Sequence, residues 1–273
     1  MCRWMAYSGN RIPMEALIFR PQHSLIDQSI ASHSKETPTN ADGFGLGWYG
    51  DLPEPGVFRS IRPAWNDNNL RDLATHISSG MFMAHVRAAS AASVQETNCH
   101  PFRWGKWLFV HNGEIAEIEK IRRDLLLAVD DSYFSNIQGT TDSELMFHLA
   151  LTLGLERDPP GALARMAGFI EQTARRKGIA EALWMTVCVS DGKHLWAVRY
   201  ASDGDAPTLY LSPEAEELWT LKPETRDLFD QSARAIVSEP MGQFVSAWTL
   251  VPASTVVMVA GAQIETAEFQ PAS

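Results

Sequence analysis

The stretch MCRWMAYSGN, residues 1–10, begins the chain with a strand pattern and places a cysteine directly after Met1. CRWMAY mixes aromatic and apolar side chains, and the Ser8, Gly9 and Asn10 that follow predict the end of that strand. Methionine is normally removed when the second residue is small. We therefore expect Met1 to be cleaved, which would leave Cys2 with a free α-amine.

Cys2 would then combine two groups that an internal cysteine lacks. Its thiol is a strong nucleophile once ionised, and an α-amine, with an ordinary pKa of about 7.7–8.0, can act as the local base. Every chain has some residue at position 2, so an ordinary strand residue remains the alternative interpretation until other residues are considered.

Composition narrows the class of protein. The 273 residues fit a single domain, 1–273, and 45% hydrophobic against 21% charged residues is an ordinary globular balance. A net charge of -10 without a long basic run gives no reason to expect a nucleic-acid partner. No secretory segment or apolar stretch of about 18 residues is present in the sequence, so no membrane partner and a cytoplasmic location are expected. Three scattered cysteines predict neither a disulfide framework nor a zinc site.

Secondary-structure patterns run from strands to helices and back to strands, without the regular alternation of a doubly wound fold. Glycines at 43, 45 and 47 share one face of a strand, where a backbone or a ligand could approach closely. The order predicts an α+β domain with mainly antiparallel strands. Helices are expected at 69–76, 117–129, 141–153 and 160–177, and strands at 2–7, 81–87, 106–115, 182–189, 194–200, 208–212, 233–239 and 254–262.

Three further places could carry chemistry, although each also has a structural interpretation. Asn112 and Gly113 are a common hairpin-turn pair, but a side-chain amide beside a glycine amide could also form an oxyanion hole. Arg87 could be a paired surface charge or a bidentate clamp for a carboxylate. Asp142 could start a helix or accept a hydrogen bond from a substrate ammonium group.

Six motifs in this order resemble the class II glutamine amidotransferases, which are N-terminal nucleophile hydrolases. The resemblance is closest to the stand-alone branch that includes the YafJ-like amidotransferases and the γ-glutamyl hydrolase of ergothioneine biosynthesis. It covers residues 1–144, and the second half matches only in length and strand content. The motifs are MCRW at 1–4, DGFGLGWY at 42–49, HVRAAS at 85–90, NCHPF at 98–102, HNGEI at 111–115 and TTDSE at 140–144.

The resemblance implies a four-layer αββα sandwich of two mainly antiparallel sheets, with the nucleophile on the first strand. It implies that Cys2 is the nucleophile, and that Asn112 with the Gly113 amide forms the oxyanion hole. Arg87 would bind the α-carboxylate of the substrate, and Asp142 its α-ammonium group. The implied reaction hydrolyses the side-chain amide of glutamine or of a γ-glutamyl compound through a glutamyl thioester, without a metal or another cofactor.

The resemblance is incomplete after Arg87. Synthase-fused members of the family often carry tryptophan and then Thr-His there, whereas this chain has Ala88, Ala89 and Ser90. We expect Ser90 to replace the threonine at the substrate. No synthase domain is expected after the matched region, so a second hypothesis is a glutaminase subunit that passes ammonia to a separate synthase. A third is a non-catalytic amino-acid-binding module, although such a module would need neither Cys2 nor Asn112.

Overall fold

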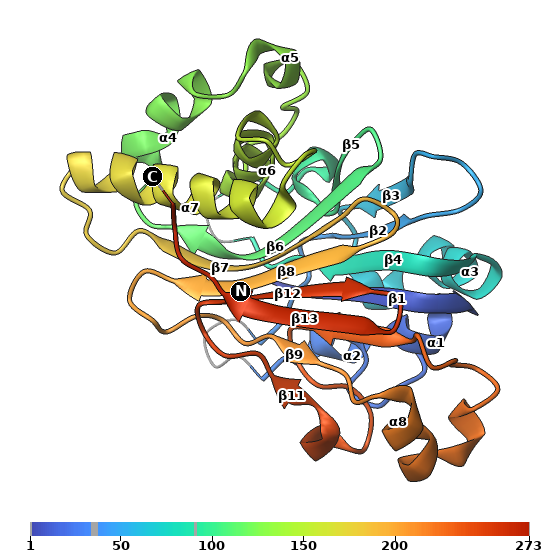
Figure 1. Ribbon diagram of the computed structural model, residues 1–273. Coiled ribbons are helices and arrows are strands. Elements are labelled where there is room, and N and C mark those ends of the chain that lie inside the picture. The colour runs from blue at the N-terminus through green and yellow to red at the C-terminus, as the bar shows by residue number, and fades with distance from the viewer. Residues whose placement is uncertain (1, 34–37, 90–91, 273) are drawn as a thin grey trace.

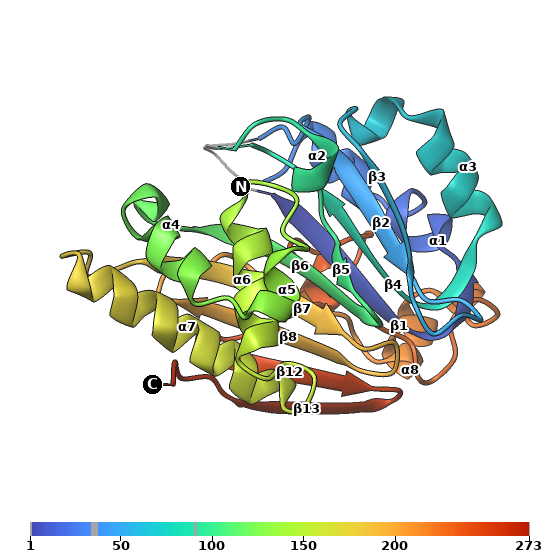
Figure 2. The same ribbon diagram turned by 90° about the horizontal axis from the view of Figure 1, so that it is seen from above.

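The computed structural model describes residues 2–33, 38–89 and 92–272 of the chain. Two antiparallel sheets pack face to face, and helices cover the outer face of each, as Figure 1 and Figure 2 show. This arrangement confirms the expected α+β class and the four-layer αββα sandwich. No helix in these ranges is long and apolar enough to cross a membrane.

The first sheet, called here the β1 sheet, has β1 at its centre between β10 and β4. Its strands pair antiparallel throughout the described residues, and β1 pairs with β4 from Arg3↔Val86 onward. Within the described residues its order is β11-β9-β10-β1-β4-β2-β3. The strands are β1 (Arg3–Pro13), β2 (Phe44–Trp48), β3 (Gly56–Ser60), β4 (Ser78–Val86), β9 (Tyr210–Leu211), β10 (Arg234–Val237) and β11 (Thr249–Leu250).

The second sheet, the β6 sheet, has the order β13-β12-β8-β7-β6-β5 among the same residues. Its central strands β6, β7 and β8 pair antiparallel, and the strands expected at 182–189 and 194–200 form a hairpin as β7 and β8. The strands are β5 (Phe102–Trp104), β6 (Trp107–Ile115), β7 (Leu183–Ser190), β8 (Leu195–Ala201), β12 (Thr255–Ala260) and β13 (Gln263–Glu268).

The helices divide between the two outer faces. Side chains of α1, α2, α3 and α8 pack on the β1 sheet, whereas side chains of α4 to α7 pack on the β6 sheet. The helices expected at 69–76 and 141–153 are confirmed as α3 and α6. The bounds are α1 (Glu15–Ile18), α2 (Leu25–Ile30), α3 (Asn68–His76), α4 (Ile118–Leu127), α5 (Asp131–Phe134), α6 (Asp142–Thr152), α7 (Pro159–Arg176) and α8 (Ala215–Leu221).

Alternation along the strands creates three apolar layers, because successive side chains point to opposite faces. On β1, Met5 and Tyr7 pack under the helices of their own sheet, whereas Trp4 and Ala6 pack between the two sheets. Cys188 on β7 also lies between the sheets, fully buried, and burial raises its pKa. Cys188 is therefore a packing residue of the layer between the sheets.

Two details differ from or refine the sequence predictions. The Ser8-Gly9-Asn10 triplet does not end β1, which continues to Pro13 through an irregularity in its register with β4 between Ser8 and Ile12. The shift in register accommodates the turn-forming residues, because the segments on both sides of it stay paired with β4. In β2, a side chain at Gly45 would meet the carbonyl oxygen of His100 at 2.1 Å, so the close approach expected there is made by backbone.

Candidate active site

Cys2 precedes β1, directly beside the end of β4. Because Arg3 is paired with Val86, the cysteine faces the segment that follows β4, and its Sγ–H group points to the carbonyl oxygen of Ala88 at 3.5 Å. The side chain is half-buried. Burial raises the pKa of the Cys2 thiol, the charge of Arg87 opposes that rise, and the charge of Asp142 adds to it. The thiol is therefore near one cation and one anion, whose charges shift its pKa in opposite directions.

Arg87 is a buried cation held by backbone oxygens. It is 3% exposed, and its Nη1 and Nη2 atoms donate to the carbonyls of Asp42 and Ala92 at 3.4 and 3.1 Å. Its backbone pairs with Gly43 on the neighbouring segment. No carboxylate lies within ion-pair distance of its guanidinium in the described part of the chain. A desolvated guanidinium without an acid partner is well suited to bind an anionic ligand.

Two buried histidines lie behind this cation and remain neutral. His100 Nδ1 lies 2.7 Å from His85 Nε2, and both rings are buried. Burial lowers the pKa of His85 to about 3 and that of His100 well below its ordinary value, and the charge of Arg87 adds to both shifts. The positive charge of Arg87 is thus not accompanied by a second positive charge from either ring.

Asn112 lies within β6 and faces the β1 sheet. Leu108 and Val110, at the same alternating positions, pack between the sheets. His111 points the other way, toward the helices, and its Nδ1 lies 2.8 Å from Ser143 Oγ. Asn112 is 3% exposed, and its Oδ1 has no hydrogen-bond partner among the residues described. The buried amide oxygen therefore retains acceptor capacity that the described residues do not use.

Gly113 belongs to the same strand, so the hairpin-turn interpretation of Asn112-Gly113 was wrong. The strand pairs Asn112 with Thr186 and Gly113 with Met185. Gly113 has φ +147°, and a Cβ there would lie 1.9 Å from the carbonyl oxygen of Trp184. Glycine is required because β7 approaches too closely for any side chain.

Asp142 is the first residue of α6, as its pattern predicts. The N-cap is Thr141, whose Oγ1 accepts a hydrogen bond from the amide of Glu144 at 3.1 Å. The Asp142 carboxylate accepts the amide of Ile115 at 3.0 Å and the amide of Ser143 at 2.8 Å. It is thereby fixed at the end of β6, two residues beyond Gly113.

Cys2 directly precedes the central strand of the β1 sheet, and Asn112 lies in the β6 sheet. Side-chain hydrogen bonds join the two sheets near both residues. The Nε1 atom of Trp4 donates to the carbonyl oxygen and the Oγ1 of Thr186, at 3.2 and 3.1 Å. Because Thr186 is the register partner of Asn112, the start of β1 lies beside that part of β6. Arg87 and Asp142 both lie close enough to Cys2 for their charges to shift the pKa of its thiol, and Asn112 lies on the face of β6 that points between the two sheets.

Ser90, the remaining predicted substrate-binding residue, lies outside the described residues. The loop leading to it is anchored, because the amide of Ala89 donates to Asp42 Oδ2 at 2.8 Å. Asp42 stands in the motif that begins the glycine-rich segment, but the sequence pattern gives no signal for this anchoring role.

Asn98 and Glu144 are further positioning residues. The sequence points to them only because they lie in the NCHPF and TTDSE motifs. Asn98, fully buried, exchanges hydrogen bonds with Thr140 at 2.7 and 3.1 Å and donates to Ser93 at 2.8 Å. Glu144 accepts the amides of Gln138 and Gly139 at 3.0 and 2.6 Å. Together they fix the segment that leads into Asp142 against the loop that follows Arg87.

The fold has clear relatives among proteins of known structure. The structure of a glutamine aminotransferase class-II domain protein from Silicibacter pomeroyi superposes with a TM-score of 0.74 at 31% identity, over 99% of this chain and 100% of that one. Glutamine phosphoribosylpyrophosphate amidotransferase from B. subtilis gives a TM-score of 0.64 at 12% identity, over 98% of this chain and 49% of that one. The architecture is therefore that of N-terminal nucleophile (Ntn) amidotransferases.

Sequence comparisons define the family more narrowly. The model for "Glutamine amidotransferases class-II" matches residues 20–210, a range that includes Arg87, Asn112, Gly113 and Asp142 but begins after Cys2. The "Probable glutamine amidotransferase DUG3" of Saccharomyces cerevisiae is 34% identical over 95% of this chain and 82% of its own length. The "Gamma-glutamyl-hercynylcysteine sulfoxide hydrolase" of Mycolicibacterium smegmatis is 29% identical over 64% of this chain and 72% of its own. The chain belongs to the class II glutamine amidotransferases and is an enzyme of that family.

Proposed function

We propose that the chain hydrolyses the side-chain amide of glutamine or of a γ-glutamyl compound, with Cys2 as the nucleophile. The observation that carries this proposal is the contact of the Cys2 thiol with the carbonyl of Ala88, directly after the buried guanidinium of Arg87. The charges of both Arg87 and the Asp142 carboxylate act on the pKa of that thiol. Neither charge has an oppositely charged partner within ion-pair distance in the described ranges. An α-amino acid headgroup supplies a carboxylate for the first and an ammonium group for the second.

The proposed reaction starts after removal of Met1, which frees the α-amine of Cys2. That amine takes the thiol proton, and the thiolate attacks the side-chain amide carbon of the substrate. The side-chain amide of Asn112 and the backbone N–H of Gly113 donate to the oxyanion that forms. The protonated amine then gives its proton to the leaving nitrogen, and the carbon–nitrogen bond breaks to leave a glutamyl thioester. Water hydrolyses the thioester, which releases glutamate and restores the thiol.

The names of the two sequence relatives support both versions of the substrate. One is called a probable glutamine amidotransferase and the other a γ-glutamyl compound hydrolase. A glutaminase subunit that feeds ammonia to a separate synthase would use the same chemistry at Cys2. The group on the far side of the amide therefore has to be found by assay.

The test uses protein whose loss of Met1 has been verified by intact mass. It is incubated with glutamine and with a panel of γ-glutamyl amides, and released glutamate is measured. We expect turnover of at least one of them by the wild type and none by Cys2→Ala, which should still bind the same compound. Equal turnover by Cys2→Ala, or no turnover of any compound by the wild type, would contradict the proposal.

A further inference from the structure

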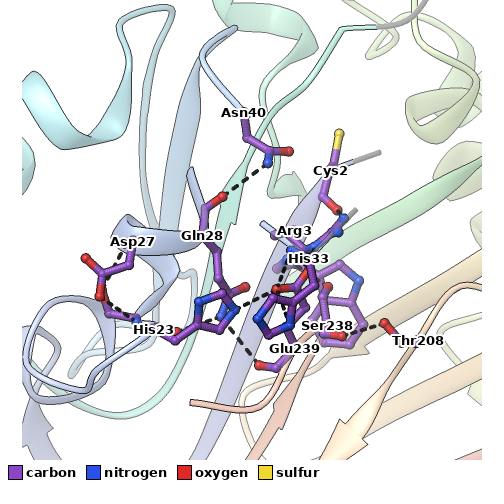
Figure 3. A network of polar contacts seen from close by, with 12 residues as sticks. Cys2, Arg3, His23, Asp27, Gln28, His33, Asn40, Thr208, Ser238 and Glu239 are labelled. Atoms are coloured by element: carbon purple, nitrogen blue, oxygen red, sulfur yellow. Dashed lines mark hydrogen bonds and ion pairs between the residues drawn. The ribbon is translucent and has the colours of Figure 1, made fainter. Parts of the chain in front are cut away.

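Behind the nucleophile lies a buried carboxylate that is bound from three parts of the chain. Glu239, two residues after β10, is 3% exposed. Figure 3 shows the polar contacts around it. One carboxylate oxygen accepts from Arg3 Nε, and the other lies 2.7 Å from His23 Nε2. The backbone amide of His33 donates to both oxygens, at 3.1 and 3.2 Å. We call Glu239, Arg3, His23 and His33 the Glu239 network.

Arg3 connects this network to the nucleophile. While its Nε atom binds Glu239, its Nη1 atom donates to the carbonyl oxygen of Cys2 at 2.8 Å. Arg3 is 5% exposed, so both bonds are shielded from water. The planar guanidinium can hold a carboxylate and a carbonyl in fixed directions at once, which a lysine ammonium on the same stem cannot reproduce.

The same carboxylate residue is connected to the wall of the site through α2. Gln28 Nε2 donates to the carbonyl oxygens of His23 and Glu239, at 3.0 and 3.4 Å. Asn40 Nδ2 in turn donates to the carbonyl oxygen of Gln28 at 3.4 Å. Asn40 lies two residues before Asp42, which anchors the loop after Arg87. The Glu239 network therefore joins the start of β1 to the segment that leads into the substrate-binding region.

A metal ion is a less suitable occupant of this cluster. Ligand atoms of His23, His33 and Glu239 lie within 4.8 Å of one another. However, the two imidazole rings stack at a centroid distance of 4.2 Å and an angle of 11°, so one metal ion could not lie in the plane of both rings. One Glu239 oxygen is already bound by Arg3, whose charge would repel a cation. The contacts describe a hydrogen-bonded ion pair.

We infer that Glu239 is a positioning residue for Cys2, acting through Arg3 on the main chain that carries both the thiol and the α-amine. This inference rests on the proposed function, because it concerns the step in which that amine takes the thiol proton. A buried ion pair contributes little to stability compared with apolar packing, but its directional bonds fix one geometry. Fixing the Cys2 carbonyl limits rotation of the residue relative to Arg87 and Asn112.

The ionic state of Glu239 suits this role. Burial alone raises its pKa, but the bonds from His23, Arg3 and the His33 amide outweigh burial and lower the pKa to about 2. The carboxylate therefore stays ionised, and Arg3 stays paired, at every pH at which the α-amine of Cys2 could act as a base.

The test compares Glu239→Gln with a matched substitution elsewhere. Glu171 on α7 is a second buried carboxylate, which accepts from Tyr200 Oη and Ser202 Oγ at 2.5 and 2.7 Å on the far side of the β6 sheet. With verified Met1 removal, we expect Glu239→Gln to lower kcat about 10- to 100-fold, because small errors in nucleophile placement are costly. KM should change less than about threefold, because Arg87 and Asp142 are intact. Glu171→Gln should change neither kcat nor KM.

Arg3→Lys is the second variant, and it keeps the positive charge. We expect it to lower kcat in the same way as Glu239→Gln, because one ammonium cannot bind both Glu239 and the Cys2 carbonyl. If both variants match the wild type in kcat, or if Glu171→Gln loses as much kcat as they do, the network is merely structural and the inference is overturned.

A further measurement separates this inference from the proposed function. Alkylation of Cys2 by iodoacetamide is followed by peptide mass spectrometry, with the buried Cys188 as an internal reference for an intact fold. We expect Glu239→Gln to slow alkylation of Cys2 severalfold while Cys188 stays unmodified. Equal rates in the two proteins would overturn the inference. Absence of turnover by the wild type on every amide would instead contradict the proposed function alone.

Discussion

Trp4 donates its indole N–H to both the carbonyl oxygen and the hydroxyl of Thr186, at 3.2 and 3.1 Å, and so joins the β1 sheet to the β6 sheet two residues after Cys2. Because Thr186 is paired with Asn112, this bond sets the position of Cys2 along the strands relative to the proposed oxyanion hole. The two sheets otherwise meet there mainly through apolar side chains.

Trp4→Phe should therefore weaken both stability and catalysis. We expect the free energy of unfolding in urea to fall by about 1–3 kcal/mol, because buried acceptors of Thr186 lose their donor. We also expect kcat to fall. Trp107→Phe is the matched control, since Trp107 is 2% exposed and its Nε1 has no partner within the described residues. A fall in kcat of the same size in Trp107→Phe would contradict the proposed role of the Trp4 bond.

Asn112→Ala should lower kcat strongly and change the free energy of unfolding little. Loss of one oxyanion donor costs about 10²- to 10³-fold in kcat in comparable reactions. The side-chain oxygen of Asn112 has no partner in the part of the chain described, so its removal should change the free energy of unfolding little. Steady-state kinetics and urea unfolding measure the two effects. A loss of kcat below about threefold would exclude Asn112 as an oxyanion donor.

Arg87→Met should act in opposite directions on binding and on stability. We expect KM for the substrate to rise about 100-fold, because a charge-assisted clamp on the carboxylate is lost. The free energy of unfolding should stay the same or rise by about 1–2 kcal/mol, because a desolvated cation, whose partners among the described residues are backbone carbonyls, is replaced by an apolar chain. Unchanged KM would show that the substrate carboxylate binds elsewhere.

Gly113→Ala should not be tolerated. Its new Cβ would meet the Trp184 carbonyl at 1.9 Å, and the backbone has φ +147°, so we expect unfolding to become easier by more than about 3 kcal/mol. Gly178→Ala is the control, because Gly178 has φ +81° but open space around it. That change should cost only about 1–2 kcal/mol, and thermal unfolding compares the two. Equal losses would mean that β7 can move away from Gly113.

The pH dependence of stability should carry the signature of Glu239. Its folded pKa, about 2, lies below its ordinary value of 4.5. Ionised Glu239 therefore stabilises the fold fully above about pH 5, and this contribution is lost as pH falls toward 2. The difference in unfolding free energy between the wild type and Glu239→Gln should shrink from pH 7 to pH 3. A constant difference over that range would contradict the lowered pKa.

Much of the fold follows from local patterns in the sequence. The helices α3 and α6 and the hairpin of β7 and β8 are confirmed because their periodicity and turn residues agree with their packing. Short or exposed elements were missed: α8 has one fully buried residue, Ala215, and β13 is mostly exposed, so neither shows a clear apolar stripe.

The candidate site, like the fold, could be predicted from the sequence only in part. Cys2, Arg87, Asn112, Gly113 and Asp142 carry side chains or backbone freedom whose chemistry is visible residue by residue. The Glu239 network could not be predicted from the sequence, because Arg3 and Glu239 are separated by 236 positions and no local pattern pairs them. The strand expected at 106–115 is confirmed as β6, whereas the alternative interpretation of Asn112-Gly113 as a hairpin turn was wrong for a related reason. A glycine required by a neighbouring strand has the same sequence signature as a glycine required by a turn.

Arg87 follows β4 in one sheet, whereas Asp142 is bonded to the end of β6 in the other. A bound amino-acid headgroup would consequently act as an ionic cross-link between the two halves of the sandwich. Ligand occupancy and the spacing of the layers would then be thermodynamically linked: any substitution that changes how the sheets slide or separate should change affinity, even far from the bound molecule.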